Sequence, residues 1–173
     1  MGPDLSAESY RRILIPHNDL TVDLVVCNSG RGQEIRGIFI NSSRCISLQK
    51  DGSKDGERWA ELIREFLDGR IRNFPHLPLD MNALTSFQKR VLDTARTVEW
   101  GRTLSYSGLA SIAGHPKAIR AAASVMAANP FPLIIPCHRI IHSDGSSGGF
   151  MGEKKGPAVE LKKWLLQREQ YSG

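Results

Sequence analysis

Cysteine is scarce in this chain, which holds only Cys27, Cys45 and Cys137 among its 173 residues. Three thiols are too few for a disulfide framework, and no CxxC pair points to a metal site. His17, Cys27 and His76 are too scattered to form a zinc site, so we expect no metal and no cofactor. The pattern leaves open a single bridge between Cys27 and Cys45.

Long apolar runs are also missing. No stretch is long enough to cross a bilayer, and the N-terminal MGPDLSAESYRR lacks the apolar core of a signal peptide. Hydrophobic residues make up 40% of the chain and charged residues 24%, which is typical of globular proteins and excludes disorder throughout. We therefore expect an intracellular protein, cytoplasmic or, in a eukaryote, nuclear, with one large or two small domains.

Acidic residues are absent from Trp100 to Ser143. Residues 1–80 hold 11 Lys and Arg against 12 Asp and Glu, whereas residues 81–173 hold 12 against 6. The net charges are −1 and +6, so the whole basic excess is C-terminal. Such a surface either meets phosphates or is simply solvated, and charge alone does not choose between the two.

The N-terminal part has the pattern of an α/β domain. Residues 20–27 and 33–40 are rich in β-branched and aliphatic residues, and the NSGRG between them predicts a hairpin. Residues 57–67 place apolar side chains at helical spacing, and Gly69 ends the helix. The proline-containing FPHLP that follows indicates a linker, so we expect domains at 1–80 and 81–173.

The C-terminal part has the pattern of a helical domain. Thr85 and Gln88 form a capping box for a helix to about Val98. Ser105 is a cap for a helix to Ile112, and after the turn at Gly114 a second helix is expected from Pro116 to Ala127. Lys117 and Arg120 would share its exposed face. Helix, tight turn and helix indicate either a DNA-binding helix-turn-helix or an αα-hairpin that binds nothing.

A last helix is expected from Pro157 to about Gln170. Leu161, Trp164 and Leu165 would form its apolar stripe. Glu169 follows Leu165 by four residues, so its carboxylate points either along the buried face, where it needs a cation or an imidazole, or out to solvent.

The run IIPCHRII, residues 134–141, sets Cys137, His138 and Arg139 in consecutive positions inside an apolar segment. Polar groups in such a setting need partners or a purpose. A nucleophilic thiolate is the purpose that these residue types favour.

The motifs from Phe87 to Glu169 resemble the O6-alkylguanine-DNA alkyltransferases. NPFPLIIPCHRII is preceded by SYSGLASIAGHPKAIRAAASVM and followed by KKWLLQRE, in the order that this family has. The resemblance implies an α/β (α+β) protein, with an N-terminal ribonuclease-H-like domain and a C-terminal winged-helix-like domain that holds the helix-turn-helix. The N-terminal part carries no comparably specific motif.

The resemblance also implies a reaction. Cys137 would take the alkyl group from O6 of guanine, with His138 as a base acting through a water and Glu169 orienting that imidazole. Tyr106 would protonate the leaving guanine, and Asn129 would hold the turn that carries the cysteine. The product is a thioether without a carbonyl for water to attack, so each molecule should act once.

The expected partner is double-stranded DNA carrying O6-alkylguanine, bound through the minor groove by a monomer. The target base must leave the stack, and Arg120 matches the family's arginine that fills the gap. The residues expected at the DNA are Arg120, Lys117, Ser105, Ala121 and Arg139. Those expected in the base pocket are Tyr106, Ile140, Phe150, Met151 and Gly152.

Two features depart from the family pattern. Met151 stands where a small residue is usual, and about five residues, EKKGP in character, are inserted after it. The range of alkyl groups, and whether O4-alkylthymine is also a substrate, are therefore left open. Three other functions compete with repair: an alkyltransferase-like protein that binds lesions without a cysteine, a helix-turn-helix regulator, and a papain-like hydrolase.

Overall fold

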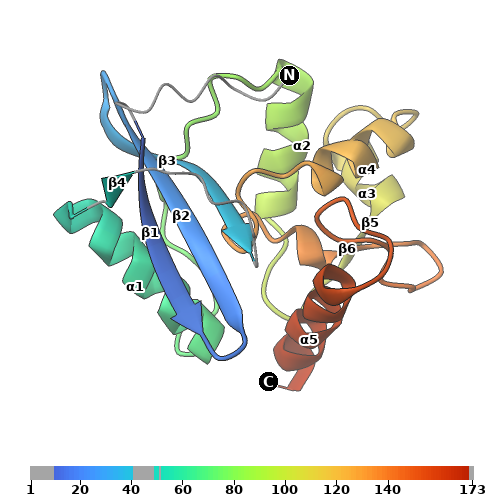
Figure 1. Ribbon diagram of the computed structural model, residues 1–173. Coiled ribbons are helices and arrows are strands. Elements are labelled where there is room, and N and C mark those ends of the chain that lie inside the picture. The colour runs from blue at the N-terminus through green and yellow to red at the C-terminus, as the bar shows by residue number, and fades with distance from the viewer. Residues whose placement is uncertain (1–9, 41–48, 51, 172–173) are drawn as a thin grey trace. The chain divides into compact units, whose positions relative to one another are not determined.

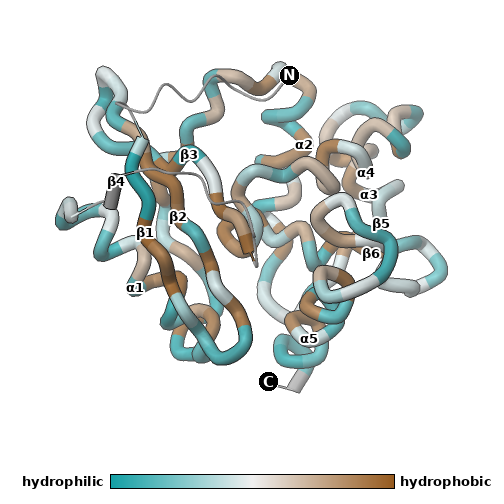
Figure 2. Tube along the Cα trace, viewed as in Figure 1, coloured by the Kyte–Doolittle hydropathy of each residue, from teal (hydrophilic) through white to brown (hydrophobic). Residues whose placement is uncertain are grey.

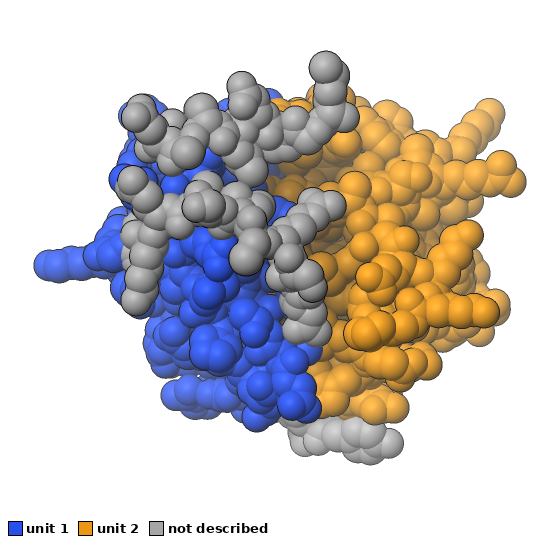
Figure 3. All heavy atoms as spheres, in the orientation of Figure 1, with its two compact units in different colours: residues 1–82 blue, residues 83–173 orange. Residues whose placement is uncertain are grey.

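The computed structural model describes residues 10–40, 49–50 and 52–171. The chain divides into two units, residues 1–82 and 83–173 (Figure 3). The sequence-based boundary between residues 80 and 81 lies close to this division.

The N-terminal unit is a four-stranded sheet with one long helix (Figure 1). Its strands are β1 (Tyr10–His17), β2 (Leu20–Ser29), β3 (Gly32–Ile40) and β4 (Gln49–Lys50), and its helix is α1 (Lys54–Asp68). The sheet order is β3-β2-β1-β4, in which β4 pairs with β1 in parallel and the other neighbours are antiparallel. Helix α1 contacts β1.

Apolar side chains explain this arrangement. Strand β2 is buried without a break from Val22 to Cys27, and every residue of this run except Asp23 is apolar. The hydrophobic colour along part of β2 in Figure 2 reflects this composition. Helix α1 buries Trp59, Ile63 and Phe66 on one face. Continuous burial is the pattern of a strand that is covered on both faces, and one-sided burial is the pattern of a helix packed on a sheet.

The predicted hairpin is present, but strand β1 was not predicted. Its inward residues Ile13 and Ile15 are buried, whereas Leu14 between them is 49% exposed. Three consecutive aliphatic residues hide the alternation that identifies a half-buried strand. The predicted helix at 57–67 begins earlier, at Lys54, because the Ser53 hydroxyl accepts the Gly56 N–H at 3.0 Å.

Cys27 is a buried free thiol in β2. Its burial is the main cause that raises its pKa to about 11, and nearby Asp80 raises it further. Cys45, the other half of the bridge that the sequence left open, lies outside the described residues.

The C-terminal unit is mainly helical, as predicted (Figure 1). Its helices are α2 (Ser86–Arg96), α3 (Tyr106–Ile112), α4 (Ile119–Ala127) and α5 (Pro157–Tyr171). The short strands β5 (Leu104–Ser105) and β6 (Ile140–Ile141) pair in parallel, and a 3-10 turn, η1 (Cys137–Arg139), precedes β6. A mixed α/β fold with a helical C-terminal unit is thus confirmed.

Local signals set the start of each helix. The capping box of Thr85 and Gln88 and the Ser105 cap of α3 are both present. Helix α4, however, begins at Ile119 and not at Pro116, so Lys117 lies in the turn before the helix and does not share its face with Arg120 as predicted. Trp164 of α5 is 39% exposed and lies outside the buried stripe.

Among the residues that the structure describes, no helix is both long enough and apolar enough to span a bilayer.

Replacing Thr85 by Ala should lower the free energy of unfolding by about 1 kcal/mol, because the Thr85 hydroxyl accepts the Gln88 N–H at 3.2 Å and alanine has no group to replace it. Urea unfolding followed by circular dichroism measures the loss. Thr103, which is also exposed, is the control, and Thr103→Ala should stay within about 0.5 kcal/mol of the original chain. Equal effects of the two substitutions would contradict a capping role.

Candidate active site

Asn129 shapes the turn that leads to Cys137. Its side-chain oxygen accepts the Phe131 N–H at 3.0 Å, and its amide donates to the Ile135 carbonyl at 3.1 Å. Leu133, between these two, has a φ of 73°, which a branched residue rarely adopts without support. The Cys137 N–H then donates to the Ile135 carbonyl at 2.7 Å. The position of Cys137 is therefore set by Asn129 and the backbone.

Glu169 of α5 is buried and holds the residues that follow Cys137. Its carboxylate accepts from His138 Nε2 at 2.8 Å and from Arg139 Nε at 2.9 Å and Nη2 at 3.0 Å. The Gly101 N–H also donates to it, at 3.2 Å. Of the two orientations that the sequence left open, the inward one is correct. One carboxylate thus ties α5, η1 and the Gly101 loop together.

Burial and charge pull the pKa values of this cluster in opposite directions. Burial lowers the pKa of His138 below its usual 6.5, although contact with Glu169 raises it in part. Burial alone would raise the pKa of Glu169, but the hydrogen bonds and charges of His138 and Arg139 outweigh it, and the pKa is lowered. The imidazole is therefore neutral and the carboxylate ionised at neutral pH. With its proton on Nε2 toward Glu169, the imidazole has Nδ1 as its acceptor.

The thiol of Cys137 and the phenol of Tyr106 keep their protons. Burial raises the pKa of Cys137, while a hydrogen bond from Asn129 and the charge of Lys162 lower it in part. Burial also raises the pKa of Tyr106, and the nearby Cys137 adds to the effect. The site therefore holds a thiol that needs a base and a phenol that can donate a proton.

Lys162 is a buried cation beside these groups that the sequence did not reveal as functional. Its side chain is fully buried, and its Nζ donates to the Ile140 carbonyl at 2.6 Å and to the Gly149 carbonyl at 3.3 Å. It lies 5.9 Å from the centre of the Tyr106 ring. Burial lowers its pKa to about 8. Helical spacing could have indicated that Lys162 is buried, because Lys162 follows the buried Leu161 and precedes the buried Leu165 by three residues.

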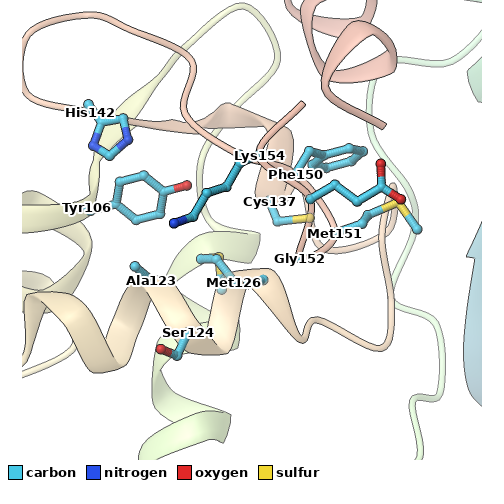
Figure 4. Close-up of a pocket in the computed structure, with 13 residues that line it drawn as sticks. Tyr106, Ala123, Ser124, Met126, Cys137, His142, Phe150, Met151, Gly152 and Lys154 are labelled. Atoms are coloured by element: carbon cyan, nitrogen blue, oxygen red, sulfur yellow. The ribbon is translucent and has the colours of Figure 1, made fainter. Parts of the chain in front are cut away.

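A cavity of about 300 Å³ opens beside Cys137 (Figure 4). Helices α3 and α4 form one side of it, and the loop after β6 forms the other. The lining residues are Tyr106, Ala123, Ser124, Met126, Ala127, Cys137, His142, Gly149, Phe150, Met151, Gly152, Glu153 and Lys154. Most of this wall is small or apolar, which suits a flat organic group.

Four of the five residues expected in the base pocket line this cavity, and Ile140 does not. Tyr106, Phe150, Met151 and Gly152 are on the wall. Ile140 is fully buried and is absent from the lining; its carbonyl accepts from Lys162 instead. Parallel pairing of β6 with β5 turns Ile140 into the core.

Arg139 does not have the surface role that the sequence predicted for it. Its side chain is buried, makes three hydrogen bonds to Glu169 and donates to the Val98 carbonyl at 2.6 Å. A guanidinium held in this way has no exposed donors to offer to DNA. The buried carboxylate of Glu169 needs a cation, and Arg139 supplies it.

The other residues predicted at DNA lie on or near α4 and α3. Arg120 and Ala121 are exposed in the first turn of α4, and Ser124, one turn further on, lines the cavity. Lys117 is exposed in the preceding turn. Ser105 is half-buried, and its hydroxyl caps α3 by accepting the Gly108 N–H at 3.0 Å. The exposed face of α4 therefore runs directly into the cavity.

A tight turn forms the wall that contains Met151. Phe150 and Glu153 exchange two backbone hydrogen bonds of 2.9 Å, and Met151 and Gly152 between them have φ values of 51° and 83°. Two positive φ values in a two-residue loop indicate a type I′ turn, which favours Asn or Gly at its first position. Met151 is therefore strained, at a cost of about 1 kcal/mol.

His142 and Lys154 also line the cavity, and sequence reasoning missed both. The His142 ring lies 5.2 Å from the Tyr106 ring, and both labelled side chains are on the same side of the cavity in Figure 4. Neither residue belongs to a recognisable motif. Among the described residues, no group of three side chains could hold a metal ion.

The C-terminal unit of the chain matches a known protein family. Residues 86–171 match the family model described as 6-O-methylguanine DNA methyltransferase, DNA binding domain. The methylated-DNA–protein-cysteine methyltransferase of Methanothermobacter thermautotrophicus is 46% identical over 110 residues, which cover 64% of this chain and 58% of that protein. The chain thus spans less than two thirds of that relative's length.

This chain covers a larger share of two further similar proteins. A DNA base-flipping protein of Thermus thermophilus is 39% identical over 113 residues, covering 65% of this chain and 71% of that protein. The crystal structure of Mycobacterium tuberculosis OGT in complex with DNA superposes with a TM-score of 0.73 at 26% identity, over 94% of this chain and 93% of that one. On these matches, the chain belongs to the 6-O-methylguanine DNA methyltransferase family.

Proposed function

We propose that this protein repairs DNA by direct reversal, moving the alkyl group of O6-alkylguanine onto the sulfur of Cys137. The observation that carries the proposal is a thiol on the wall of a base-sized cavity, followed in the chain by an imidazole that is bonded to a buried carboxylate. The relatives named methylated-DNA–protein-cysteine methyltransferase support the same chemistry. The site of action would be the cytoplasm, or the nucleus of a eukaryotic cell.

The substrate is double-stranded DNA, from which the damaged base must be flipped into the cavity. Cys137 is only 3% exposed, so a stacked base cannot reach it. The exposed face of α4 would lie in the minor groove, where Ala121 and Ser124 allow close approach and Arg120 fills the gap left in the stack. One chain carries both the groove-binding helix and the thiol, so a monomer is sufficient.

The reaction balances with the groups present. His138 Nδ1 takes the thiol proton through a water, and the Cys137 sulfur attacks the alkyl carbon. The bond from that carbon to O6 breaks, and its electron pair stays with the guanine, which receives a proton from Tyr106. Glu169 stabilises the imidazolium formed in the first step, and the Lys162 ammonium stabilises the negative charge on sulfur and phenol.

A raised thiol pKa makes the base necessary, because Cys137 holds almost no thiolate of its own at neutral pH. The thioether product has no carbonyl and cannot be hydrolysed back by the same site, so the protein is consumed in the reaction. O4-alkylthymine presents a similar alkyl–oxygen bond and is a second possible donor in this proposal.

A lesion-binding protein that transfers nothing is the main alternative, and the name of the Thermus thermophilus relative favours it. Cys137 distinguishes the two functions, since binding alone needs no thiol with a base beside it. A helix-turn-helix regulator would not need this site either, and a papain-like hydrolase would release an unmodified cysteine.

Incubation with a duplex that contains O6-methylguanine should replace the Cys137 proton by a methyl group. Mass spectrometry of the peptides identifies the modified residue. Cys137→Ser should abolish transfer while leaving affinity for the duplex nearly unchanged. Tight binding without any mass gain in the original chain would overturn the proposal in favour of lesion binding.

Transfer should be independent of pH from about 6.5 to just below 8 and should fall below pH 6.5, because burial lowers the pKa of His138 from 6.5. It should also fall above about pH 8, where Lys162 loses the charge that stabilises the sulfur and the phenol. Protonated His138 cannot accept the thiol proton, so rate is lost as the pH falls through the lowered pKa. Rapid-quench measurement of the transfer rate from pH 5 to 9 tests this.

In Glu169→Gln the uncharged amide no longer stabilises the imidazolium, and we expect a transfer rate at least about 10-fold lower. Arg139 also loses its counter-ion, so the rate is compared at a temperature where circular dichroism shows the variant folded. Glu160→Gln is the matched control, since that carboxylate is exposed on the same helix and pairs with Lys163. A rate in Glu169→Gln equal to that of the control would contradict the relay.

Arg120→Ala should slow transfer from duplex DNA about 10-fold or more, because stacking in the gap is worth about 1–3 kcal/mol. Transfer from free O6-benzylguanine, which needs no flipping, should change less than about 2-fold. Arg102→Ala removes another exposed arginine of the same basic segment and serves as the control. Equal losses on duplex and free base would exclude a role in flipping.

A further inference from the structure

Lys154 lies on the wall of the Cys137 cavity, in the segment after the Phe150–Glu153 turn. Figure 4 shows its side chain directed into the cavity, toward Tyr106 and helix α4. The residue as a whole is exposed, so its ammonium group is at the mouth and not in the core. The proposed alkyl transfer assigns it no role.

The ammonium of Lys154 has no counter-ion among the described residues. Lys163 of the same unit pairs with Glu160 at 2.9 Å, and Lys162 donates to two carbonyls, but no such contact is found for Lys154. The neighbouring Glu153 turns its Oε2 toward Gly156, where an added Cβ would lie 3.6 Å from that oxygen. A cation is therefore available at the cavity mouth for a partner from outside.

The turn before Lys154 fixes the position of its backbone. Phe150 and Glu153 close the tight turn with two hydrogen bonds. A Cβ at Gly149 would come within 2.5 Å of the Glu153 carbonyl oxygen, so the two sides of this turn touch. Because Lys154 follows the turn directly, its position on the rim is a property of the turn and not of a free loop.

A flipped nucleotide would place its negatively charged phosphates at the mouth of this cavity. Its base enters a mostly apolar cavity, whereas its phosphates stay at the mouth, because an unpaired charge in apolar surroundings is costly. A lysine ammonium is a suitable partner for a phosphate oxygen, and as a point charge on a flexible stem it tolerates variation in the phosphate position.

Building on the proposed function, we propose that Lys154 is a substrate-positioning residue that binds a backbone phosphate next to the flipped nucleotide. It holds the nucleotide over Cys137 from the side opposite α4. It takes no part in bond making or proton transfer.

The test compares two substrates that differ in their phosphates: the nucleoside O6-methyl-2′-deoxyguanosine, and a single-stranded trinucleotide with the same lesion in its centre. Neither requires flipping from a duplex. The transfer rate is measured over a range of substrate and salt concentrations for the original chain, Lys154→Gln, Lys154→Arg and Lys155→Gln. Lys155 is the matched control, because it is the adjacent exposed lysine and does not line the cavity.

Lys154→Gln should bind the trinucleotide about 2- to 5-fold more weakly, as expected for one exposed ion pair, with the maximal transfer rate unchanged. The slope of log affinity against log salt should become smaller by about 0.7, the value for one phosphate on a single strand. Reaction with the nucleoside should be unaffected, and Lys154→Arg should restore both affinity and slope.

Equal effects of Lys154→Gln on nucleoside and trinucleotide, or an equal effect of Lys155→Gln, would overturn the inference. No alkylation of the original chain by either substrate or by lesion-bearing duplex would instead overturn the proposed function itself, so the two failures are distinguishable.

Discussion

The buried carboxylate of Glu169 is the interaction on which the site depends. It accepts hydrogen bonds from His138, Arg139 and the Gly101 backbone, and so joins the last helix to the turn that carries Cys137. A carboxylate in this position is costly unless it is fully paired, and removing one partner of such a pair costs about 3–5 kcal/mol. The same carboxylate that holds the turn in place also orients the His138 imidazole, so the fold of the turn and the proposed proton transfer both depend on Glu169.

The protonation states around Glu169 fit a nucleophile that is formed only when needed. Burial keeps the proton on Cys137 and on Tyr106, and it keeps His138 neutral. Lys162, whose pKa is about 8, places a positive charge near the sulfur and the phenol. A thiol, a neutral base and a phenolic donor are the starting states that alkyl transfer requires, whereas a resident thiolate would make the base unnecessary.

The sequence predicted the residues that carry local signals. The capping box at Thr85 and the cap at Ser105 follow from short-range chemistry, and the structure contains both. The roles of Asn129 and Glu169 followed from the family resemblance, and the side chains of both make hydrogen bonds around Cys137 and His138 in the structure. It did not predict features that depend on three-dimensional packing. The sequence predicted Arg139 as a DNA contact, but in the structure it is bonded to the buried carboxylate of Glu169. No role was predicted for Lys162 from the sequence, but in the structure its ammonium donates to the Ile140 carbonyl in the core. The strained backbone of Met151 likewise depends on a tight turn that the sequence did not predict.

If Cys137 accepts one alkyl group irreversibly, each protein molecule reacts once. The deciding measurement is the number of labelled methyl groups transferred per protein molecule in a large excess of duplex DNA containing O6-methylguanine, followed over time. We expect a rise to one methyl group per molecule and then no further transfer. Continued turnover, or a plateau at zero with the DNA bound, would contradict it.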